Sequence, residues 1–411
     1  MTSRQTTTAL LCGFVLLGIV LRIHALAEPY LFTFDEELFA RNAHRYLIRL
    51  QDLNDHPPAG KVFIALGLIL FGYGSLGWRF ASLWFGIYTI AIGYWLGSAL
   101  FRDRRAGFFV GAFMAADGFF IAYSRAGLMD GVLTCFVLAT MLAAVVARRP
   151  RGVAVAAVLG GVAMSVKWSG AFTVFPAVAA VWTLGRAPKW SVLLFALVPL
   201  VHLAIWTAAL AWTGQPADPA SLFKVMHDLF WHHVELGKHH NGLASPWYSW
   251  IYLYHPIVTK LSSHGLGARY SSSVGNLAFA VASALLVLGA PLAALVLATL
   301  AWLKKKAPNA GARAEWKPYL LCAFGWLAML SPWTVGRGEF TFHYHYLPSY
   351  GFAVVLLGGA AARLERVRAN AVFGFVLASA VIALYFAPVW GEYTVSEAAA
   401  NRRLVFKNWQ P

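Results

Sequence analysis

Acidic residues and cysteines are scarce in this chain of 411 residues. Only 17 Asp and Glu accompany 33 Lys and Arg, and charged residues make up 12% of the sequence. The three cysteines, Cys12, Cys135 and Cys322, fall within apolar runs, which argues against a disulfide framework and indicates packing residues. Strand-like alternation is not apparent, and the Gly-x-x-x-x-Gly-Lys-Ser/Thr phosphate loop is absent. We therefore expect no glycine-rich nucleotide-binding loop.

Apolar residues dominate what remains. Hydrophobic residues account for 59% of the chain, with 17 Trp and 29 Phe, and the mean hydropathy is +0.62. This composition lies far from that of an ordinary soluble domain. The apolar runs approach about 20 residues, the length that a helix needs to cross roughly 30 Å of hydrocarbon. We expect an all-α polytopic membrane protein.

The apolar runs predict about eleven transmembrane helices. The fifth and sixth runs are short and are separated by Lys167, and Gly160 and Gly161 would permit a bend, so these two runs are alternatively one kinked or re-entrant element. The expected spans are 8–27, 78–100, 107–123, 129–147, 152–166, 168–184, 191–212, 274–303, 318–333, 345–361 and 371–388.

Basic residues concentrate in alternate connections between these spans. Seventeen basic residues face three acids there, a net charge of +14, whereas the rest of the chain carries +2. The positive-inside rule places these connections and the N-terminus in the cytoplasm. The pI near 9.9 is then a topology signal, and no nucleic-acid partner is expected. The basic residues are Arg4, Arg102, Arg104, Arg105, Arg148, Arg149, Arg151, Arg186, Lys189, Lys304, Lys305, Lys306, Arg313, Lys317, Arg363, Arg366 and Arg368.

Two long loops, 28–77 and 213–273, are expected on the other side, folded as interfacial helices. The first contains Asp35 and Glu36. A carboxylate near hydrocarbon is costly and usually faces water, a partner or a substrate. Such an acid can act as a general base, a cation ligand or a hydrogen-bond acceptor. The alternative is that these acids cap the start of an interfacial helix.

Basic groups also occur at the outer ends of spans. Arg79, Arg125 and Lys167 either extend to the lipid headgroups or, with His343 and His345, form a cationic pocket for a phosphate.

The second loop is rich in histidine, but adjacent histidines project to different sides of a helix. Interfacial hydrogen bonding is therefore the default interpretation, and we expect no metal site. The use of a divalent cation in a reaction is left open. These histidines are His232, His233, His239 and His240.

Several short motifs follow one another along the chain in a recognisable order. Phe34-Asp35-Glu36 followed by His56-Pro57-Pro58-Ala59-Gly60-Lys61 resembles the first luminal loop of the protein O-mannosyltransferase family, in its compact bacterial form. One stretch departs from the pattern, because His239-His240-Asn241 stands where bacterial relatives have His-Pro-Tyr. The likeness continues in Trp78-Arg79, Ser124-Arg125, Leu128-Met129-Asp130, Lys167-Trp168-Ser169-Gly170, His233-Val234-Glu235-Leu236, Ser245-Pro246-Trp247-Tyr248-Ser249-Trp250, Gly275-Asn276 and His343-Tyr344-His345-Tyr346-Leu347-Pro348.

The resemblance implies one GT-C glycosyltransferase domain over residues 1–411 in the cytoplasmic membrane, with its active site on the outer face. Mannose would pass, with inversion, from a polyprenyl-phosphate donor to a Ser or Thr hydroxyl of a secreted or membrane protein. No cofactor is firmly implied. Membrane lipid and contact with the protein-translocation machinery complete the expected partners.

Site residues follow from the same resemblance and from the needs of inverting transfer, which requires a base and a positive charge near the departing phosphate. Asp35 is the expected base, and Glu36 supports it or holds the acceptor. The phosphate-binding candidates are Arg79, Arg125, Lys167, His343 and His345. The other substrate-binding candidates are His56, Lys61, Asp130, Trp247 and Trp250.

Two alternatives stay open. A related lipid-linked sugar transferase could act on a glycan or on lipid A with the same combination of acid and cation. A transporter could use Asp35 and Asp130 as an ion relay, but inverted repeats and mid-span charges, the usual signatures of transporters, are not evident.

Overall fold

The structure is a computed structural model. The residues that it describes are 2–28, 30–33, 35–52, 55–184, 186–238, 241–252, 255–264, 267–303, 310–335, 341–404, 406 and 409. The sequence features above that lie outside the described residues are Phe34, His239, His240, Lys304, Lys305 and Lys306.

Each of the eleven expected spans coincides with helix. Within the described residues, six helices are long and apolar enough to cross a membrane, and a bent pair would make a seventh. The number of crossings therefore stays a prediction. The helices of these regions are α1 (Ser3–Ile23), α4 (Ser75–Phe101), α5 (Arg104–Ala115), α6 (Gly118–Arg125), α7 (Asp130–Val146), α8 (Pro150–Val166), η1 (Trp168–Thr173), α9 (Val174–Leu184), η2 (Lys189–Ala196), α10 (Leu197–Trp212), α13 (Leu277–Leu303), α14 (Ala310–Leu330), η3 (Ser331–Trp333), η4 (His343–Tyr346), α15 (Leu347–Val367) and α16 (Ala369–Trp390).

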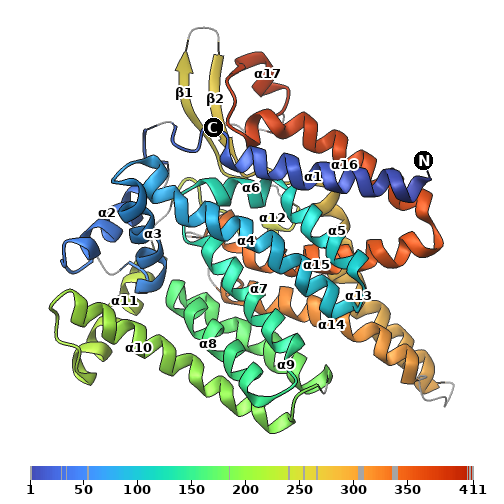
Figure 1. Ribbon diagram of the computed structural model, residues 1–411, viewed down its shortest axis with the longest axis horizontal. Helices are drawn as coiled ribbons and strands as arrows, with labels where there is room; N and C mark the ends of the chain where they lie inside the picture. Colours follow the sequence, from blue (N-terminus) through green and yellow to red (C-terminus); the bar gives the residue numbers. More distant parts are fainter. Residues whose placement is uncertain are drawn as a thin grey trace.

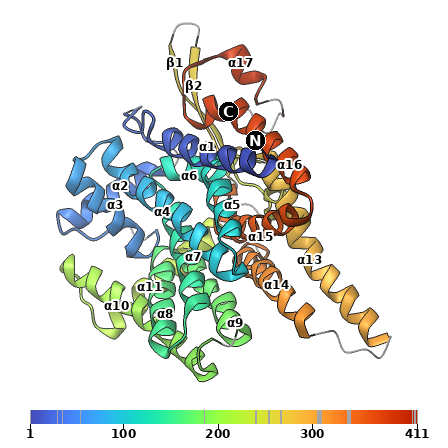
Figure 2. The same cartoon turned by 45° about the vertical axis from the view of Figure 1, so that its right-hand side comes forward.

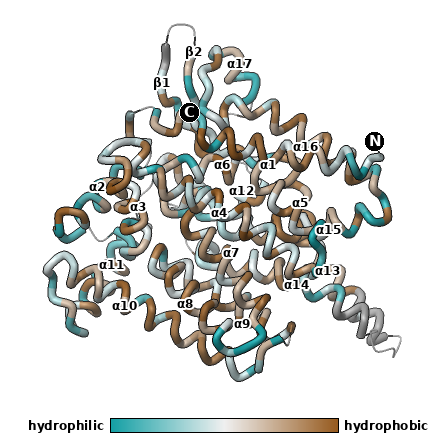
Figure 3. The backbone as a smooth tube through the Cα atoms, in the orientation of Figure 1, coloured by the Kyte–Doolittle hydropathy of each residue, from teal (hydrophilic) through white to brown (hydrophobic). Residues whose placement is uncertain are grey.

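Helix α15 lies at the centre of the bundle, packed against α5, α7 and α14 (Figure 1). Its apolar window is 83% buried, whereas the windows of the other five long helices are 39% buried or less. The outer helices thus keep exposed apolar surface, as helices that face lipid do. Hydrophobic residues follow these helices, and hydrophilic segments gather at helix ends and connections (Figure 3). Two views show α13 and α14 projecting together from the bundle (Figures 1 and 2).

The fifth and sixth spans form an antiparallel hairpin and are not one kinked helix. Lys167 ends α8 with extended backbone angles, φ −146° and ψ 143°, and η1 then folds back against α8. A Cβ atom at Gly170 would lie 2.3 Å from the carbonyl carbon of Ala163, so this close approach requires glycine. The reversal therefore occurs at Lys167, not at Gly160 and Gly161.

The third expected span is broken. Helices α5 and α6 meet at an angle of 60°. Asp117 caps α6 by accepting a hydrogen bond from the Phe119 amide at 2.9 Å, and it also accepts from the Asn276 amide at 3.0 Å and the Tyr350 hydroxyl at 2.9 Å. A buried carboxylate requires such donors, and the bend brings them together.

The first long loop contains the expected helices, α2 (Glu36–Leu47) and α3 (Pro58–Phe71). Pro58 opens α3, at a position where the missing amide hydrogen costs nothing. The connection from α3 to α4 has Gly-x-Gly-x-x-Gly spacing, at Gly72, Gly74 and Gly77, which in other proteins can mark a dinucleotide-binding loop. It follows a helix, whereas a dinucleotide-binding loop follows a strand. Gly72 adopts φ +77°, and a Cβ at Gly77 would lie 2.1 Å from its carbonyl oxygen, so these glycines serve a tight turn.

The second long loop is only partly helical, which corrects the expectation of interfacial helices alone. It contains α11 (Pro219–Leu236) and α12 (Trp247–Trp250), then the strands β1 (Val258–His264) and β2 (Gly267–Ser272). The strands pair antiparallel, with Val258 opposite Ser272 and His264 opposite Gly267. The short β3 (Val395–Ser396), followed by α17 (Glu397–Asn401), pairs with β2 and joins the C-terminal segment to this loop (Figure 1).

Connections expected in the cytoplasm lie together at one end of the bundle. Glu365 accepts two hydrogen bonds from Arg105, at 2.7 and 2.6 Å, and lies 3.7 Å from Arg4. Arg366 pairs with Asp103 in the same region. The three acids of the basic connections therefore neutralise bases of neighbouring connections, since Glu315 also pairs with Arg363.

Candidate active site

A cavity of about 600 Å³ lies where the first loop, the Lys167 turn, α11 and η4 meet. This volume is in the range of small-molecule sites. Its polar lining consists of Asp35, Asp55, His56, Lys167, Ser169, His232, His233, Thr341, Tyr344 and His345. Aromatic walls come from Phe39, Trp168, Trp333 and Phe342.

Asp35 lies at the cavity wall, immediately before α2. Asp35 is the N-cap residue of α2, and Glu36 and Glu37 lie in its first turn, as the capping alternative expects. The Asp35 side chain, however, makes no capping hydrogen bond to the described start of α2. Instead, the Tyr344 hydroxyl donates to Asp35 Oδ2 at 3.3 Å. Burial raises the pKa of Asp35, and the charge of Lys167 and the Tyr344 hydrogen bond oppose this increase. The carboxylate is therefore a stronger base than an exposed aspartate would be.

Lys167 supplies the positive charge of the cavity. Its Nζ donates to both carboxylate oxygens of Asp130, at 3.0 and 2.8 Å, and lies 4.9 Å from the ring centroid of Tyr344. An ammonium group has three hydrogens, so one remains for a ligand. Asp130, at the first residue of α7, thus fixes the position of Lys167 and is not among the described residues that line the cavity.

The two late histidines have different positions. His345 lines the cavity, stacks on Trp333 with ring centroids 3.7 Å apart, and accepts a hydrogen bond at Nδ1 from the Phe342 amide. Its Nε2 must then carry the hydrogen of the neutral ring. His343 is fully buried, stacks on Phe119, and has Nδ1 3.3 Å from the Ser273 hydroxyl. The structure places His345, and not His343, at the cavity.

His56 and His233 approach each other on another part of the wall, with ring centroids 5.2 Å apart. Burial and the charge of Lys167 lower the pKa of His56 well below its usual range. Burial also lowers the pKa of His233. Nδ1 of His233 lies 2.9 Å from the Leu229 carbonyl oxygen and donates to it. Both histidines are therefore neutral at physiological pH.

Glu36 and Arg79 do not reach the cavity. Arg79 donates to both oxygens of Glu36, at 2.9 and 3.0 Å. Its remaining hydrogens go to carbonyls of residues 26, 28 and 31, so all five are engaged. Glu36 also accepts from the amides of Thr33 and Gly127. This network fixes the segment that ends at Asp35.

Two other basic candidates also lie away from the cavity. Arg125 pairs with Glu392 at 2.9 Å and donates to carbonyls at the end of α1, including that of His24 at 2.7 Å. Lys61 is fully buried between Asp52 and Asp55. Neither is among the described residues at the cavity wall.

The aromatic candidates of the second loop stand behind the cavity. Trp250 is fully buried, donates to the Ser245 hydroxyl at 2.9 Å, and has its ring 6.2 Å from that of His345. Trp247 packs against the main core. Asp55, Tyr344 and Trp333 line the cavity but were not among the site residues predicted from the sequence. Asp55 could have been found from its position directly before the His-Pro-Pro motif.

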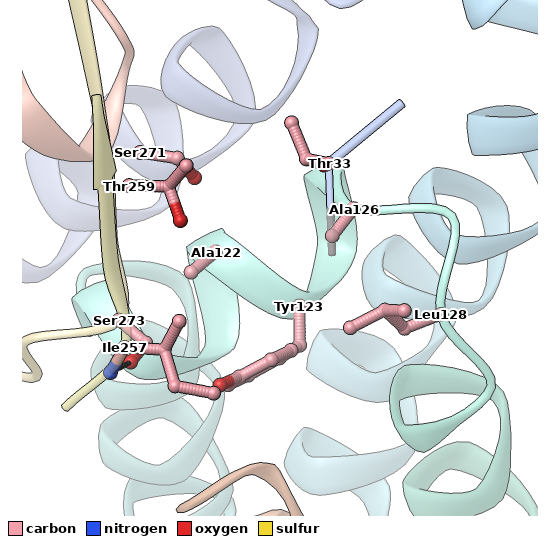
Figure 4. A pocket seen from close by; sticks show the side chains of 9 residues that line it. All are labelled: Thr33, Ala122, Tyr123, Ala126, Leu128, Ile257, Thr259, Ser271 and Ser273. Atoms are coloured by element: carbon pink, nitrogen blue, oxygen red, sulfur yellow. Dashed lines mark hydrogen bonds between the residues drawn. The ribbon is translucent and has the colours of Figure 1, made fainter. Parts of the chain in front are cut away.

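A second, much smaller pocket of about 40 Å³ lies between α6 and the base of the β hairpin. Figure 4 shows the Tyr123 hydroxyl directed toward Ser273, with Thr259 and Ser271 on the strands and Thr33 across the pocket. This space suffices for one or two water molecules and not for a sugar. The described ranges contain no group of three or more His, Cys, Asp or Glu placed to hold a metal ion.

Two family models together match most of the chain. Residues 13–211 match dolichyl-phosphate-mannose-protein mannosyltransferase, and residues 220–409 match the C-terminal four-transmembrane region of protein O-mannosyltransferase. The chain belongs to this family. A polyprenol-phosphate-mannose–protein mannosyltransferase of Mycobacterium tuberculosis is 37% identical over 93 residues, which are 23% of this chain and 18% of that protein. The match thus spans less than a fifth of the curated relative's length.

Solved structures show that this family member has the GT-C fold. The Saccharomyces cerevisiae Pmt1-Pmt2 complex bound to the sugar donor matches with a TM-score of 0.77 at 13% identity, over 99% of this chain and 93% of that chain. ArnT from Cupriavidus metallidurans bound to undecaprenyl phosphate matches with a TM-score of 0.58 at 16% identity, over 93% and 76%.

Proposed function

We propose that this protein transfers mannose, with inversion, from polyprenyl-phosphate mannose to Ser or Thr hydroxyls of translocated proteins at the outer face of the cytoplasmic membrane. The observation that carries the proposal is that Asp35 and Lys167 share one cavity, with Tyr344 contacting both. A base and a cation are the two groups that transfer from a sugar phosphate to a hydroxyl requires. Family membership and the donor named in the relatives support the choice of substrate.

Bond changes follow from this arrangement. The acceptor hydroxyl oxygen attacks C1 of mannose on the face opposite the phosphate, and its proton passes to Asp35. The bond between C1 and the phosphate oxygen breaks, and polyprenyl phosphate leaves as an anion. Lys167 Nζ and the Nε2 hydrogen of His345 stabilise the departing phosphate through charge-assisted hydrogen bonds. Because a lipid-linked donor carries no nucleotide, this reaction needs no nucleotide-binding loop.

The remaining predicted residues act through these groups. Asp130 holds Lys167, and the Glu36–Arg79 pair holds the segment that ends at Asp35. Arg125 and Lys61 stabilise the surrounding elements through their own ion pairs. We therefore assign phosphate binding to Lys167 and His345, and positioning to Asp130, Glu36, Arg79, Arg125 and Lys61. His56 lines the cavity and keeps its role as a substrate-binding candidate.

The test is transfer by the purified protein. Incubation with radiolabelled polyprenyl-phosphate mannose and a Ser/Thr peptide should label the peptide and release polyprenyl phosphate in equal amounts. Asp35→Asn keeps the shape of the side chain but cannot take the proton, so turnover should fall by about two to four orders of magnitude while donor binding survives. Glu37→Gln is the matched control, because Glu37 is exposed and pairs with Arg41.

Two results would contradict the proposal in different ways. Failure of the wild-type protein to label any Ser/Thr peptide, despite bound donor, would contradict the activity. Near-normal turnover by Asp35→Asn would remove Asp35 from the role of base and leave the activity standing.

A further inference from the structure

Besides Asp35, two hydrogen-bond donors and two acceptors of the cavity wall come from different elements, the donors from the Lys167 turn and η4 and the acceptors from α11 and the turn before α3. Lys167 and His345 can only donate there, since the ammonium has no lone pair and Nδ1 of His345 is already an acceptor. His233 has the opposite tautomer. Its Nδ1 hydrogen is donated to the Leu229 carbonyl, so the lone pair of the neutral ring is on Nε2. The backbone thus sets two histidines of one cavity in opposite roles.

Asp55 adds a second acceptor beside His233. Its Oδ1 accepts from the Asn42 amide at 2.9 Å and from Lys61 Nζ at 3.1 Å. Its Oδ2 is buried and has no hydrogen-bond partner among the described residues, although the residue lines the cavity. Lys61 is shared with Asp52, so one ammonium faces two carboxylates. A buried carboxylate oxygen without a donor is costly, which favours a ligand that brings one.

Hydroxyl groups of a sugar are donors of this kind, whereas a phosphate presents only acceptors and must lie on the donor side. Two aromatic rings of the cavity wall offer apolar surface for the sugar ring: Trp333 stacks on His345, and the Trp168 ring lies 6.0 Å from that of His233. Orientation of the donor substrate follows from this division: the phosphate lies toward Lys167 and the hexose toward α11.

We propose that His233 and Asp55 form the hexose subsite of the cavity and determine sugar specificity by accepting hydrogen bonds from hydroxyls of the transferred sugar. The inference rests on the proposed function, because it assumes a polyprenyl-phosphate hexose as donor. It adds residues from α11 and from the turn before α3 to the substrate contacts.

A cycle that combines protein variants with donor analogues tests the subsite. The analogues are polyprenyl-phosphate mannoses that lack one hydroxyl each, at C2, C3, C4 or C6, and kcat/KM is measured for each. Removing a hydroxyl that His233 or Asp55 binds should lower kcat/KM of the wild type by about 10- to 100-fold. The same removal should cost less than about 3-fold in the variant that lacks the acceptor, because the bond is already lost.

Two variants remove the acceptors with little change in shape. His233→Asn retains an amide hydrogen near the Leu229 carbonyl but has no acceptor at the Nε2 position, whereas His233→Gln can restore one. In Asp55→Asn, the donors Asn42 and Lys61 keep the amide oxygen at the Oδ1 position, so an NH₂ group replaces Oδ2. His227→Ala is the matched control on the same helix, since His227 is exposed and is not among the described cavity residues.

The outcomes separate this inference from the proposed function. If the four deoxy donors lose kcat/KM by the same factors in wild type, His233→Asn and Asp55→Asn, the subsite is wrong while the transferase activity stands. If the wild type transfers no mannose, the proposed function fails first.

Wild-type protein alone gives a second measurement, should the variants fail to fold. Donors carrying fluorine in place of a hydroxyl are compared with the deoxy donors in competition for donor binding. Fluorine cannot donate, so a hydroxyl bound by an acceptor should lose as much affinity by fluorination as by removal. Recovery of affinity with fluorine at all four positions would overturn the subsite.

Discussion

The carboxylates of Asp35 and Glu36 meet different partners although they are adjacent in the chain. Successive residues at the start of a helix point about 100° apart, so the two side chains leave α2 in different directions. Glu36 turns toward Arg79 and is fully buried, whereas Asp35 turns toward Tyr344 and the cavity. One acid therefore has a structural role, and the other remains available to a substrate.

The pH dependence of transfer should report the ionisation of Asp35. Burial raises the pKa of this carboxylate above 3.8, and a base must be deprotonated to act. Activity should therefore fall by about tenfold per pH unit as the pH decreases below that raised pKa. Tyr344→Phe removes a hydrogen bond that favours the charged form, so kcat/KM should begin to fall at a higher pH than in wild type.

Tyr123→Phe is the control for this shift, because the Tyr123 hydroxyl faces the small pocket by the hairpin. Its pH profile should match that of the wild type. Superimposable profiles for Tyr344→Phe and wild type would show that the Tyr344 hydroxyl does not act on the group that limits the rate.

The sequence indicates which acids and bases gather in this region, but it does not distinguish a residue that contacts substrate from one that supports it. Arg79, Lys167 and His343 all carry groups that can bind a phosphate, and in the sequence all three stand near the outer ends of expected spans. Their roles depend on partners such as Glu36, Asp130 and Ser273, which come from distant parts of the chain. Tautomers likewise depend on backbone groups that a residue pattern does not identify.

At the scale of elements, ion pairs of Arg79 and Arg125 join segments that the bundle alone would leave loose. Arg79 connects the end of α1, the segment before α2 and the start of α4. Arg125 connects α6 with the end of α1 and with Glu392 beyond α16. The spanning helices were predictable from the length of their apolar runs, whereas the hairpin β1–β2 and its partner β3 were not. Their pairing joins residue 267 to residue 396, and β3 has two residues.

We call the hydrogen bonds of Arg79 to Glu36 and to the carbonyls of residues 26, 28 and 31 the Arg79 clamp. Its loss should lower the stability of the folded protein and should not act directly on the transfer reaction. Arg79→Gln leaves Glu36 buried without its cation, which should lower the free energy of unfolding by about 3 to 5 kcal/mol, measured by denaturant titration in detergent. The double variant Arg79→Gln with Glu36→Gln should recover part of the loss, because no buried charge then remains unpaired. Arg41→Gln, which removes an exposed pair with Glu37 on α2, should leave stability unchanged.

An opposite result would restore the expectation that Arg79 binds the phosphate. Normal stability of Arg79→Gln combined with lost donor binding would mean that the guanidinium leaves Glu36 to meet the donor. Reduced stability with donor binding intact in the folded fraction would confirm the clamp.

At the scale of the whole molecule, the basic connections lie at one end and the two long loops lie at the other. Basic connections with paired acids lie at one end, where Glu365 and Asp103 meet Arg105 and Arg366. Both long loops and the segment after α16 lie together at the other end, where Arg269 of β2 donates to Glu28 and to the Glu392 carbonyl. The connections that the positive-inside rule assigns to one side are thus also neighbours in space. The proposed outer-face reaction requires that the cavity end face away from the cytoplasm.

Impermeant thiol reagents should show this orientation in intact spheroplasts. Single cysteines are introduced at exposed positions into a variant in which Cys12, Cys135 and Cys322 are replaced. Arg41→Cys in α2 and Lys238→Cys after α11 should react from outside. The basic connections, with their net charge of +14, are expected in the cytoplasm, so the two long loops lie on the opposite side of the membrane. Asn370→Cys, in the first turn of α16 beside the basic connection, should react only after the membrane is opened. Labelling of Asn370→Cys in intact spheroplasts, with protection of the two loop positions, would place the cavity in the cytoplasm, where a translocated acceptor could not reach Asp35.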